Sequence, residues 1–278
     1  MDIFQRVNRK DPNRIAYEEP LYTMSELYHE ASKLNHENFM AIARHIRELV
    51  DKDFFLKLCS RSYKTYPTSE SVSLPYTFDD TSLSKSLRSL VLKRRSIRDF
   101  GGGSISLDNL ANIIFNAYAI TAKTYLKPGI EQKLRAVPSG GALYPLELYI
   151  AAFNVEGLSS GVYHYNVEAH ALELVREGQF SAEFGRAFFY EEIFEGVSAT
   201  FIITGRIRRS FIKYGERAYR FMTLEAGHLG QNLCLASFAL ELGCLMLGGF
   251  YDDDIDDILE VDGVNEMTLY TANIGTIK

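Results

Sequence analysis

Residues 137–145 read VPSGGALYP, and this stretch decides how the rest of the chain is interpreted. Pro138 and Pro145 bracket a short run that begins with small side chains. Gly140 and Gly141 have no Cβ atom, so their backbone amides can come close to a flat ligand. No lysine followed by serine or threonine comes after these glycines, which argues against a phosphate-binding P-loop. From residue types alone, the stretch fits a ligand-binding loop and a tight turn before a strand equally well.

A second candidate lies upstream, in the stretch KRRSIR at residues 93–98. It combines four cations with the hydroxyl group of Ser96. Arginine guanidinium groups match phosphate oxygens in a bidentate manner, and a serine hydroxyl can add one more hydrogen bond. Basic residues at the end of a helix also interact favourably with the helix dipole. The stretch therefore fits either a phosphate site or the solvated basic end of a helix.

Two further candidates lie downstream. Gly248 and Gly249 follow a buried apolar run, which indicates either a ligand against bare backbone or a simple turn. Lys213 and Tyr214 are adjacent in the sequence. A neighbouring cation favours the phenolate form of a tyrosine, and a phenolate can act as a general base. The pair also fits a surface lysine beside a packed tyrosine. Adjacent residues on a helix point apart. We therefore expect the two to cooperate only in an extended or irregular segment, or through a water molecule.

The composition of the whole chain limits its function. Its 278 residues carry a formal charge of −6 and 46% of them are apolar, which indicates a globular protein that does not bind nucleic acid. The three cysteines are too few for a disulfide framework, and no cysteine or histidine spacing indicates a metal site. The first 20 residues lack the apolar run of a signal peptide, and Glu241 and three glycines interrupt the longest apolar stretch, 233–250. We expect a cytoplasmic protein without a metal or a membrane partner.

Hydrophobic periodicity predicts an α+β fold in which helices and strands are mixed. The predicted helices are two amphipathic helices within 22–58, then 84–95, 107–119 with Ser106 as its N-cap, 180–192, a long central helix over 215–242 with Gly243 as its C-cap, and 252–260. The predicted strands are 146–153, 161–165, 171–175, 198–206, a short buried strand that begins near Cys244, and 267–274. Residues 60–86 are rich in serine and threonine and predict an extended connector. We expect an N-terminal extension with its connector over 1–83 and a main domain over 84–278.

Taken in order, four motifs resemble one family: RRSxR, PSGGALYP, VYHY, and a long helix with EAGHxxQN that leads to GGF. They are similar to the SagB-type branch of the FMN-dependent nitroreductases, which includes the azoline oxidases (thiazole/oxazole dehydrogenases) of modified-peptide clusters. The resemblance covers about residues 22–278. It implies a nitroreductase-like fold, with a central, mostly antiparallel sheet flanked by helices and a long central helix. It also implies a two-fold homodimer with FMN at the interface.

The resemblance implies a role for each matching residue. Cofactor contacts fall on Arg94, Arg95, Ser96 and Arg98 around the phosphate, ribityl chain and pyrimidine edge, on Pro138, Ser139, Gly140 and Gly141 along the flavin ring, on Gly248 and Gly249 near N5, and on Gln231 and Asn232 toward the cofactor or the dimer partner. Lys213 and Tyr214 match the Lys-Tyr pair of the azoline oxidases. The chain departs from many nitroreductases near its C-terminus, where Lys278 is the only basic residue. Arg206, Arg217 and Arg220 are alternative phosphate ligands among which the sequence does not choose.

The function implied by this resemblance is oxidation of thiazoline or oxazoline rings in a ribosomal peptide to thiazoles or oxazoles. Tyr214 would take the proton from the ring carbon that was a Cα, Lys213 would favour the phenolate or orient it, and hydride would pass to FMN, which O₂ reoxidises. A precursor peptide and a cyclodehydratase are the implied partners. Two alternatives stay open: an FMN-dependent NAD(P)H reductase or dehydrogenase of another small molecule, of the nitro or quinone type, and a scaffold subunit without catalysis.

Overall fold

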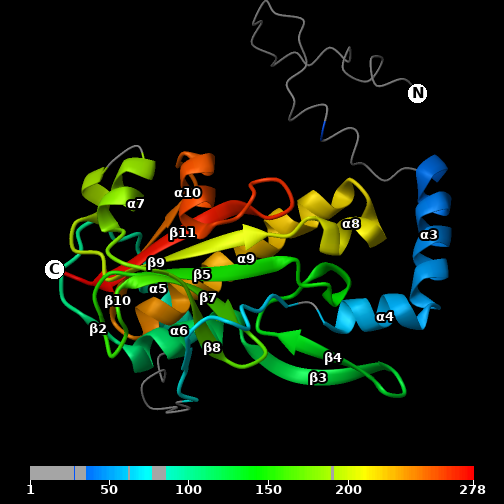
Figure 1. The fold of residues 1–278 in the computed structure, drawn as a ribbon, viewed down its shortest axis with the longest axis horizontal. Coiled ribbons are helices and arrows are strands. Elements are labelled where there is room, and N and C mark those ends of the chain that lie inside the picture. Colours follow the sequence, from blue (N-terminus) through cyan, green and yellow to red (C-terminus); the bar gives the residue numbers. More distant parts are fainter. Residues whose placement is uncertain (1–27, 29–35, 62, 77–85, 189–190) are drawn as a thin grey trace, which may run out of the picture.

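A seven-stranded sheet forms the centre of the computed structural model of this chain (Figure 1), which describes residues 28, 36–61, 63–76, 86–188 and 191–278. Every pair of neighbouring strands in this sheet is antiparallel. In spatial order the strands are β1 (Ser71–Ser73), β8 (Ala171–Glu177), β7 (Gly161–Asn166), β5 (Leu146–Ala152), β9 (Ala199–Gly205), β11 (Met267–Thr276) and β10 (Leu242–Leu247). The prediction of a central, mostly antiparallel sheet is confirmed.

The sheet is buried on both faces, which explains the continuous apolar runs of its central strands. Every residue of β5 and β9 is buried. Side chains alternate along β5, so that Leu148 and Ile150 join one core cluster and Tyr149 and Ala151 join the other. The strand over 146–153 could be predicted because its apolar run is short and is bounded by turns.

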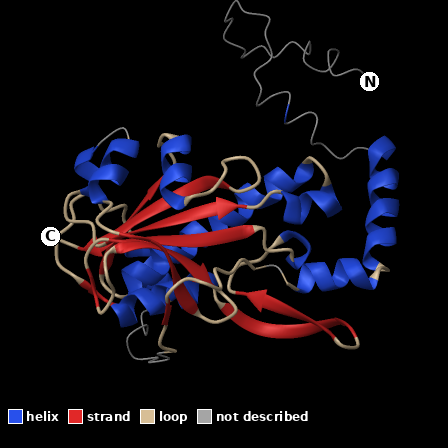
Figure 2. Cartoon of the chain, in the orientation of Figure 1, coloured by secondary structure: helices blue, strands red, loops and turns tan. Residues whose placement is uncertain are grey.

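Helices cover both faces of the sheet (Figure 2). On one face α6 (Leu107–Tyr118) and α9 (Arg217–Ala239) supply apolar side chains to the first cluster. On the other face α7 (Ser181–Ala187) and α10 (Asp252–Leu259) supply the second cluster. The predicted N-cap of α6 is confirmed, because the Asn109 backbone N–H donates to Ser106 Oγ at 3.1 Å.

The long helix predicted over 215–242 differs from the structure at both ends. The helix begins at Arg217, and a separate helix that was not predicted, α8 (Arg208–Tyr214), precedes it; Gly215 with φ of +55° separates the two. The prediction of Gly243 as the C-cap is wrong, because α9 ends at Ala239 and Gly243 lies inside β10. Gly243 lacks a side chain for a packing reason: a Cβ atom there would lie 3.0 Å from Ile97 Cγ2.

The N-terminal part contains α3 (His36–Val50) and α4 (Asp53–Ser60), two helices as predicted; of residues 22–35, only Tyr28 lies among those that the structure describes. The connector after α4 contributes β1 to the edge of the main sheet. Residues 77–85 of the connector also lie outside the described residues. The boundary at residue 84 stays a prediction.

Several smaller elements complete the fold. The helix predicted over 84–95 is α5 (Leu87–Lys93), with residues 84 and 85 outside the described part, and the one predicted over 180–192 is α7 followed by a 3-10 turn at Glu191–Phe194. The hairpin of β3 (Ile120–Lys127) and β4 (Ile130–Arg135) was not predicted, because β3 is mostly exposed and β4 buries the polar side chains of Gln132 and Arg135 beside Ile130. The short strands β2 (Ile105–Ser106) and β6 (Val155–Glu156) pair in parallel. In the described residues, no helix is long and apolar enough to cross a membrane.

Candidate active site

Lys213 and Tyr214 meet the glycines of the PSGGALYP stretch. A Cβ atom on Gly141 would lie 2.7 Å from Lys213 Nζ and would clash with the Tyr214 hydroxyl group. Lys213 Nζ lies 5.2 Å from the centre of the Tyr214 ring. Both residues form the last turn of α8, so the segment is not extended or irregular; of the two expected ways to cooperate, the one through a water molecule stays a prediction. Their side chains are long enough to reach the same glycine.

The glycine loop is held in a strained conformation by its own hydrogen bonds. Gly140–Ala142 form a 3-10 turn, in which Gly141 has φ of +64°. Ala142 and Tyr144 also have positive φ values, of 53° and 45°, although neither is a glycine. The Tyr144 N–H donates to Ser139 Oγ at 2.9 Å, and Gln132 Nε2 donates to the Ala142 carbonyl at 3.0 Å. Strained backbone of this kind clusters at functional sites, because the surroundings must hold it.

The first turns of α9 pack against this loop. A Cβ atom on Gly140 would lie 3.2 Å from the Phe221 ring, so the loop rests directly on that side chain. The Tyr214 and Phe221 rings meet edge to face, with centres 4.9 Å apart. The loop, the end of α8 and the start of α9 therefore form one packed unit.

Glu225 lies one turn further along α9 and is buried, with 2% of its surface exposed. The Tyr118 hydroxyl donates to its Oε1 at 3.4 Å, and Oε2 has no hydrogen-bond partner among the described residues. Burial raises the pKa of Glu225 to about 7, and the neighbouring Ser139 and Arg135 oppose this only in part. Glu225 is the first residue of the EAGHxxQN motif, but the sequence analysis gave it no role, although a carboxylate on the apolar face of a predicted helix is a usable signal.

An ion pair ties α8 to the start of β5. Arg209 Nη1 donates to the Tyr144 carbonyl at 3.1 Å, and Nη2 of the same side chain binds the carboxylate of Glu147. Burial alone would raise the pKa of Glu147, but Arg209 and His164 outweigh burial and lower it to about 2. The pair fixes the direction in which α8 leaves the sheet, and thereby the place of Lys213 and Tyr214.

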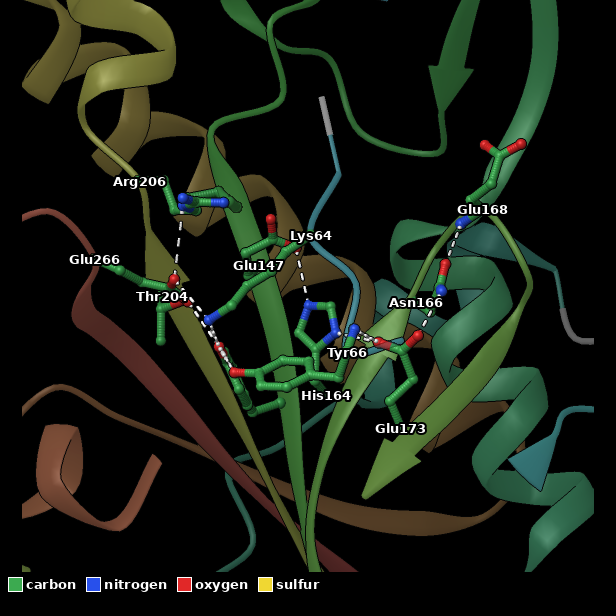
Figure 3. Close-up of polar contacts among 12 residues, drawn as sticks. Lys64, Tyr66, Glu147, His164, Asn166, Glu168, Glu173, Thr204, Arg206 and Glu266 are labelled. Carbon is green, nitrogen blue, oxygen red and sulfur yellow. Dashed lines mark hydrogen bonds and ion pairs between the residues drawn. The ribbon is translucent and has the colours of Figure 1, made fainter. Parts of the chain in front are cut away.

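A buried polar network continues from Glu147 across the sheet (Figure 3). His164 lies between two carboxylates, with Nε2 3.1 Å from Glu147 Oε2 and Nδ1 3.3 Å from Glu173 Oε2. Lys64 of the connector binds Glu266 Oε2 at 2.9 Å. Burial favours neutral His164, yet its hydrogen bonds to the two carboxylates outweigh burial and raise its pKa. This network fastens the connector to the sheet.

The basic segment 94–98 lies at the other end of α9. The Ile97 N–H donates to the Cys244 carbonyl at 3.1 Å, just after α9 has ended, whereas Gly140 packs near its start. The 23 residues of α9 span about 34 Å, and Figure 1 shows α5 and α8 toward opposite ends of it. One chain therefore does not bring segment 94–98 together with Gly141 and Tyr214.

Within the segment, Arg95 donates from Nη1 to the carbonyls of Leu92 and Arg94 at the end of α5. Ser96 and Arg98 are exposed.

The remaining candidates lie at different points. Gly248 and Gly249 are exposed, and a Cβ atom on Gly248 would meet the Tyr270 ring no closer than 3.6 Å, so this backbone is open to a ligand. Gln231 is exposed, whereas Asn232 Nδ2 donates to the Ala117 carbonyl at 3.4 Å and fastens α9 to α6. The alternative phosphate ligands Arg206, Arg217 and Arg220 lie at or just before α8 and in the first turn of α9, at the Lys213 end. In the described residues, no group of His, Cys, Asp or Glu is arranged to hold a metal ion.

An antiparallel sheet between two layers of helices, with exposed glycine backbone and exposed cations near one long helix, defines an α+β protein with a candidate ligand site. The chain belongs to the nitroreductase family, whose model matches residues 91–276, more than half of its length. FMN is the cofactor of this family, so the chain is an FMN-type oxidoreductase.

Comparison with individual proteins gives the same family. MJ1384 of Methanocaldococcus jannaschii, which is named as a nitroreductase, is 33% identical over 175 residues, 63% of this chain and 84% of MJ1384. The trifolitoxin-processing protein TfxB of Rhizobium leguminosarum bv. trifolii is 30% identical over 163 residues, 57% of this chain and 44% of TfxB. The chain thus matches less than half the length of TfxB.

Two solved structures share the fold. A protein of Anabaena variabilis, also named as a nitroreductase, superposes with a TM-score of 0.71 at 24% identity over 91% of this chain and 46% of its own. A chain of the Escherichia coli microcin synthetase McbBCD complex, solved with truncated pro-MccB17 bound, superposes with a TM-score of 0.58 at 20% identity over 89% of this chain and 99% of its own. Both confirm the predicted nitroreductase-like fold.

Proposed function

We propose that this chain is an FMN-dependent dehydrogenase that oxidises thiazoline or oxazoline rings in a ribosomal peptide to thiazoles or oxazoles. The observation that carries the proposal is the convergence of Lys213 and Tyr214 on Gly141. The similarity to TfxB and to a chain of the microcin synthetase complex supports a role in peptide modification. The Lys-Tyr pair favours azoline oxidation over a general reductase.

Each residue of this pair has a separate task. As the phenolate, the Tyr214 oxygen takes the proton from the ring carbon that was a Cα, and Lys213 Nζ, close to the same point, orients the tyrosine. Gly141 leaves the space into which both head groups project. Bound FMN supplies the acceptor for the hydride that leaves the neighbouring ring CH₂, and O₂ then takes the electron pair. The ring loses one proton and one hydride, and its aromatic product makes the oxidation favourable.

The residues present fit FMN in two separate groups. Arg94, Ser96 and Arg98 offer two cations and a hydroxyl for the phosphate, with Arg95 beside them, while the open backbone of Gly248 and Gly249 suits a flat ring. The loop Pro138–Gly141 would cover the ring, and Gln231 lies between the groups. Because segment 94–98 and the loop Pro138–Gly141 lie toward opposite ends of α9, we propose a homodimer in which a second copy completes each site. The precursor peptide and a cyclodehydratase are the proposed partners, since the ring must form before it is oxidised.

The test replaces Tyr214 with Phe in the FMN-loaded protein and presents a thiazoline peptide. The variant should keep FMN, measured by absorbance, and lose azole formation, measured by mass spectrometry, by about 100-fold or more, because a general base contributes at least that much. Tyr125→Phe is the matched control, since Tyr125 is 68% exposed on the β3–β4 hairpin. Full activity in Tyr214→Phe would remove the assignment.

A second candidate is an FMN-dependent NAD(P)H reductase of nitro or quinone compounds, which the match to MJ1384 favours. Adding NADH or NADPH without oxygen separates the two. Rapid bleaching of the flavin together with no change in a thiazoline peptide would favour the reductase.

A further inference from the structure

A cavity of about 340 Å³ lies between α4 and α8, beside the candidate active site. Phe55 and Cys59 of α4 and Leu143 of the glycine loop line it, and the same three residues belong to the apolar cluster on which Tyr214 packs. Ile212, two residues before Tyr214, lines the cavity from α8. A ligand in this cavity would therefore contact the elements that carry Lys213 and Tyr214.

Four arginines give the cavity a positive charge: Arg61, Arg206, Arg208 and Arg209. No Asp or Glu lines it among the described residues. Two of these arginines form ion pairs with glutamates that do not line the cavity: Arg209 with Glu147, and Arg206 with Glu266 at 3.7 Å.

The other two arginines keep their charge available for a ligand. Arg208 Nε donates to the neutral side chain of Asn265 at 2.9 Å. Arg61 and Arg208 are both exposed, and neither forms an ion pair with any other described residue. Guanidinium groups stay charged at every working pH, so the cavity is positive throughout.

We infer that this cavity binds a carboxylate of the substrate peptide, carried by an acidic side chain or a chain end close to the reacting ring. The inference rests on the proposed function, which makes the ligand a peptide. A single arginine guanidinium can bind a carboxylate in a bidentate geometry, and a second one nearby adds to the attraction. The apolar part of the wall, including Phe55, Leu58 and Ile212, suits the aliphatic body that carries such a group. The cavity would select peptides with an acidic residue at a fixed distance from the azoline.

The test uses labelled synthetic peptides with one thiazoline among alanines. A single Asp is placed in turn at each of the three positions on either side of the ring, and each Asp peptide has an Asn twin. Binding to the FMN-loaded protein is measured by fluorescence anisotropy at low and high salt. Variants Arg61→Gln and Arg208→Gln, alone and combined, are compared with Arg186→Gln, which removes an exposed arginine from α7 on the opposite core layer.

At least one Asp peptide should bind about tenfold more tightly than its Asn twin, because charge-assisted hydrogen bonds are the stronger kind. High salt should reduce this preference. The combined variant should abolish it, and Arg186→Gln should keep it. The inference is overturned if Asp and Asn peptides bind equally at every position, if the preference survives in the combined variant, or if that variant loses FMN, which would assign the arginines to the cofactor phosphate.

Failure of this inference and failure of the proposed function give different results. An Asp preference that depends on the arginines, in a protein that forms no azole, supports the cavity and removes the dehydrogenase assignment. Azole formation from Asp and Asn peptides that bind equally supports the dehydrogenase and removes the cavity site.

Discussion

Gly141 is the residue on which the candidate active site depends most directly. Its φ of +64° is easily reached only without a side chain, and a Cβ atom there would displace Lys213 Nζ and the Tyr214 hydroxyl group. Backbone strain and steric exclusion thus act at the same position. The two effects can be separated by experiment, because the chain contains another glycine, Gly129, with a positive φ but with open space where a Cβ atom would lie.

Gly141→Ala should destabilise the protein by about 1 kcal/mol or more and should also abolish azole formation, because the methyl group forces the Lys-Tyr pair away. Gly129→Ala is the control: Gly129 has φ of +80°, but nothing lies within 4 Å of a Cβ atom there. It should show a similar loss in the free energy of unfolding, measured with urea, and keep full activity. Equal activity in the two variants would contradict the role of Gly141.

At the scale of elements, helix α9 connects the glycine loop with the core. Its buried face carries apolar side chains into the first core cluster, and Glu225 interrupts that face behind the loop. With a pKa of about 7 instead of the ordinary 4.5, folded Glu225 holds its proton where the unfolded chain has released it. Glu225 therefore stabilises the fold fully below about pH 4.5, and this contribution is lost as pH rises to about 7.

Glu225→Gln should remove this pH dependence, since glutamine does not ionise. The fall in the free energy of unfolding between pH 5 and pH 8 should be smaller in the variant by about 2.5 kcal/mol, because this pH range covers most, but not all, of the titration between the two pKa values. Urea unfolding at both pH values measures it, with Glu177→Gln, at an exposed position on β8, as the control. The same pH dependence in wild type and Glu225→Gln would show that Glu225 does not titrate in this range.

At the scale of the whole molecule, the separation of the two residue groups along α9 predicts a composite site. Segment 94–98 packs beside β10, and the Lys213–Tyr214 pair packs against the glycine loop, toward the other end of α9 (Figure 1). A two-fold dimer forms two equivalent sites, each from both chains. Mixed dimers can test this arrangement.

One chain would carry Arg94→Ala with Arg98→Ala, and the other Lys213→Ala with Tyr214→Phe, each with its own affinity tag. Co-expression and two-step purification isolate mixed dimers. Both parent dimers should be inactive, while the mixed dimer should recover about half of the wild-type activity, because one of its two sites contains no substitution. A mixed dimer as inactive as its parents would show that each site belongs to a single chain.

Much of this molecule follows from local sequence. The strands 146–153 and 198–206 could be predicted because both faces of each strand are buried, which gives continuous apolar runs. Ser106 predicts the start of α6, because its side chain accepts a hydrogen bond from a backbone N–H that has no partner within the helix. The β3–β4 hairpin and β1 were not predicted, because β3 is mostly exposed, β4 buries polar side chains, and β1 has only three residues. Gly243 was misassigned because a glycine near the end of a helix can either cap the helix or allow close packing in a following strand. Only its packing against Ile97 shows that Gly243 does the second.

The sequence by itself determined the family, the mostly antiparallel sheet and the identity of the Lys-Tyr and glycine candidates, because these depend on residue type and on order along the chain. Only the tertiary structure decided which candidates meet. Lys213 and Tyr214 reach Gly141 because Arg209 and Glu147 fix α8 against the sheet, and segment 94–98 lies apart because α9 is long and straight enough to separate its ends. Distance between residues remote in sequence is set by packing, and no local pattern encodes it.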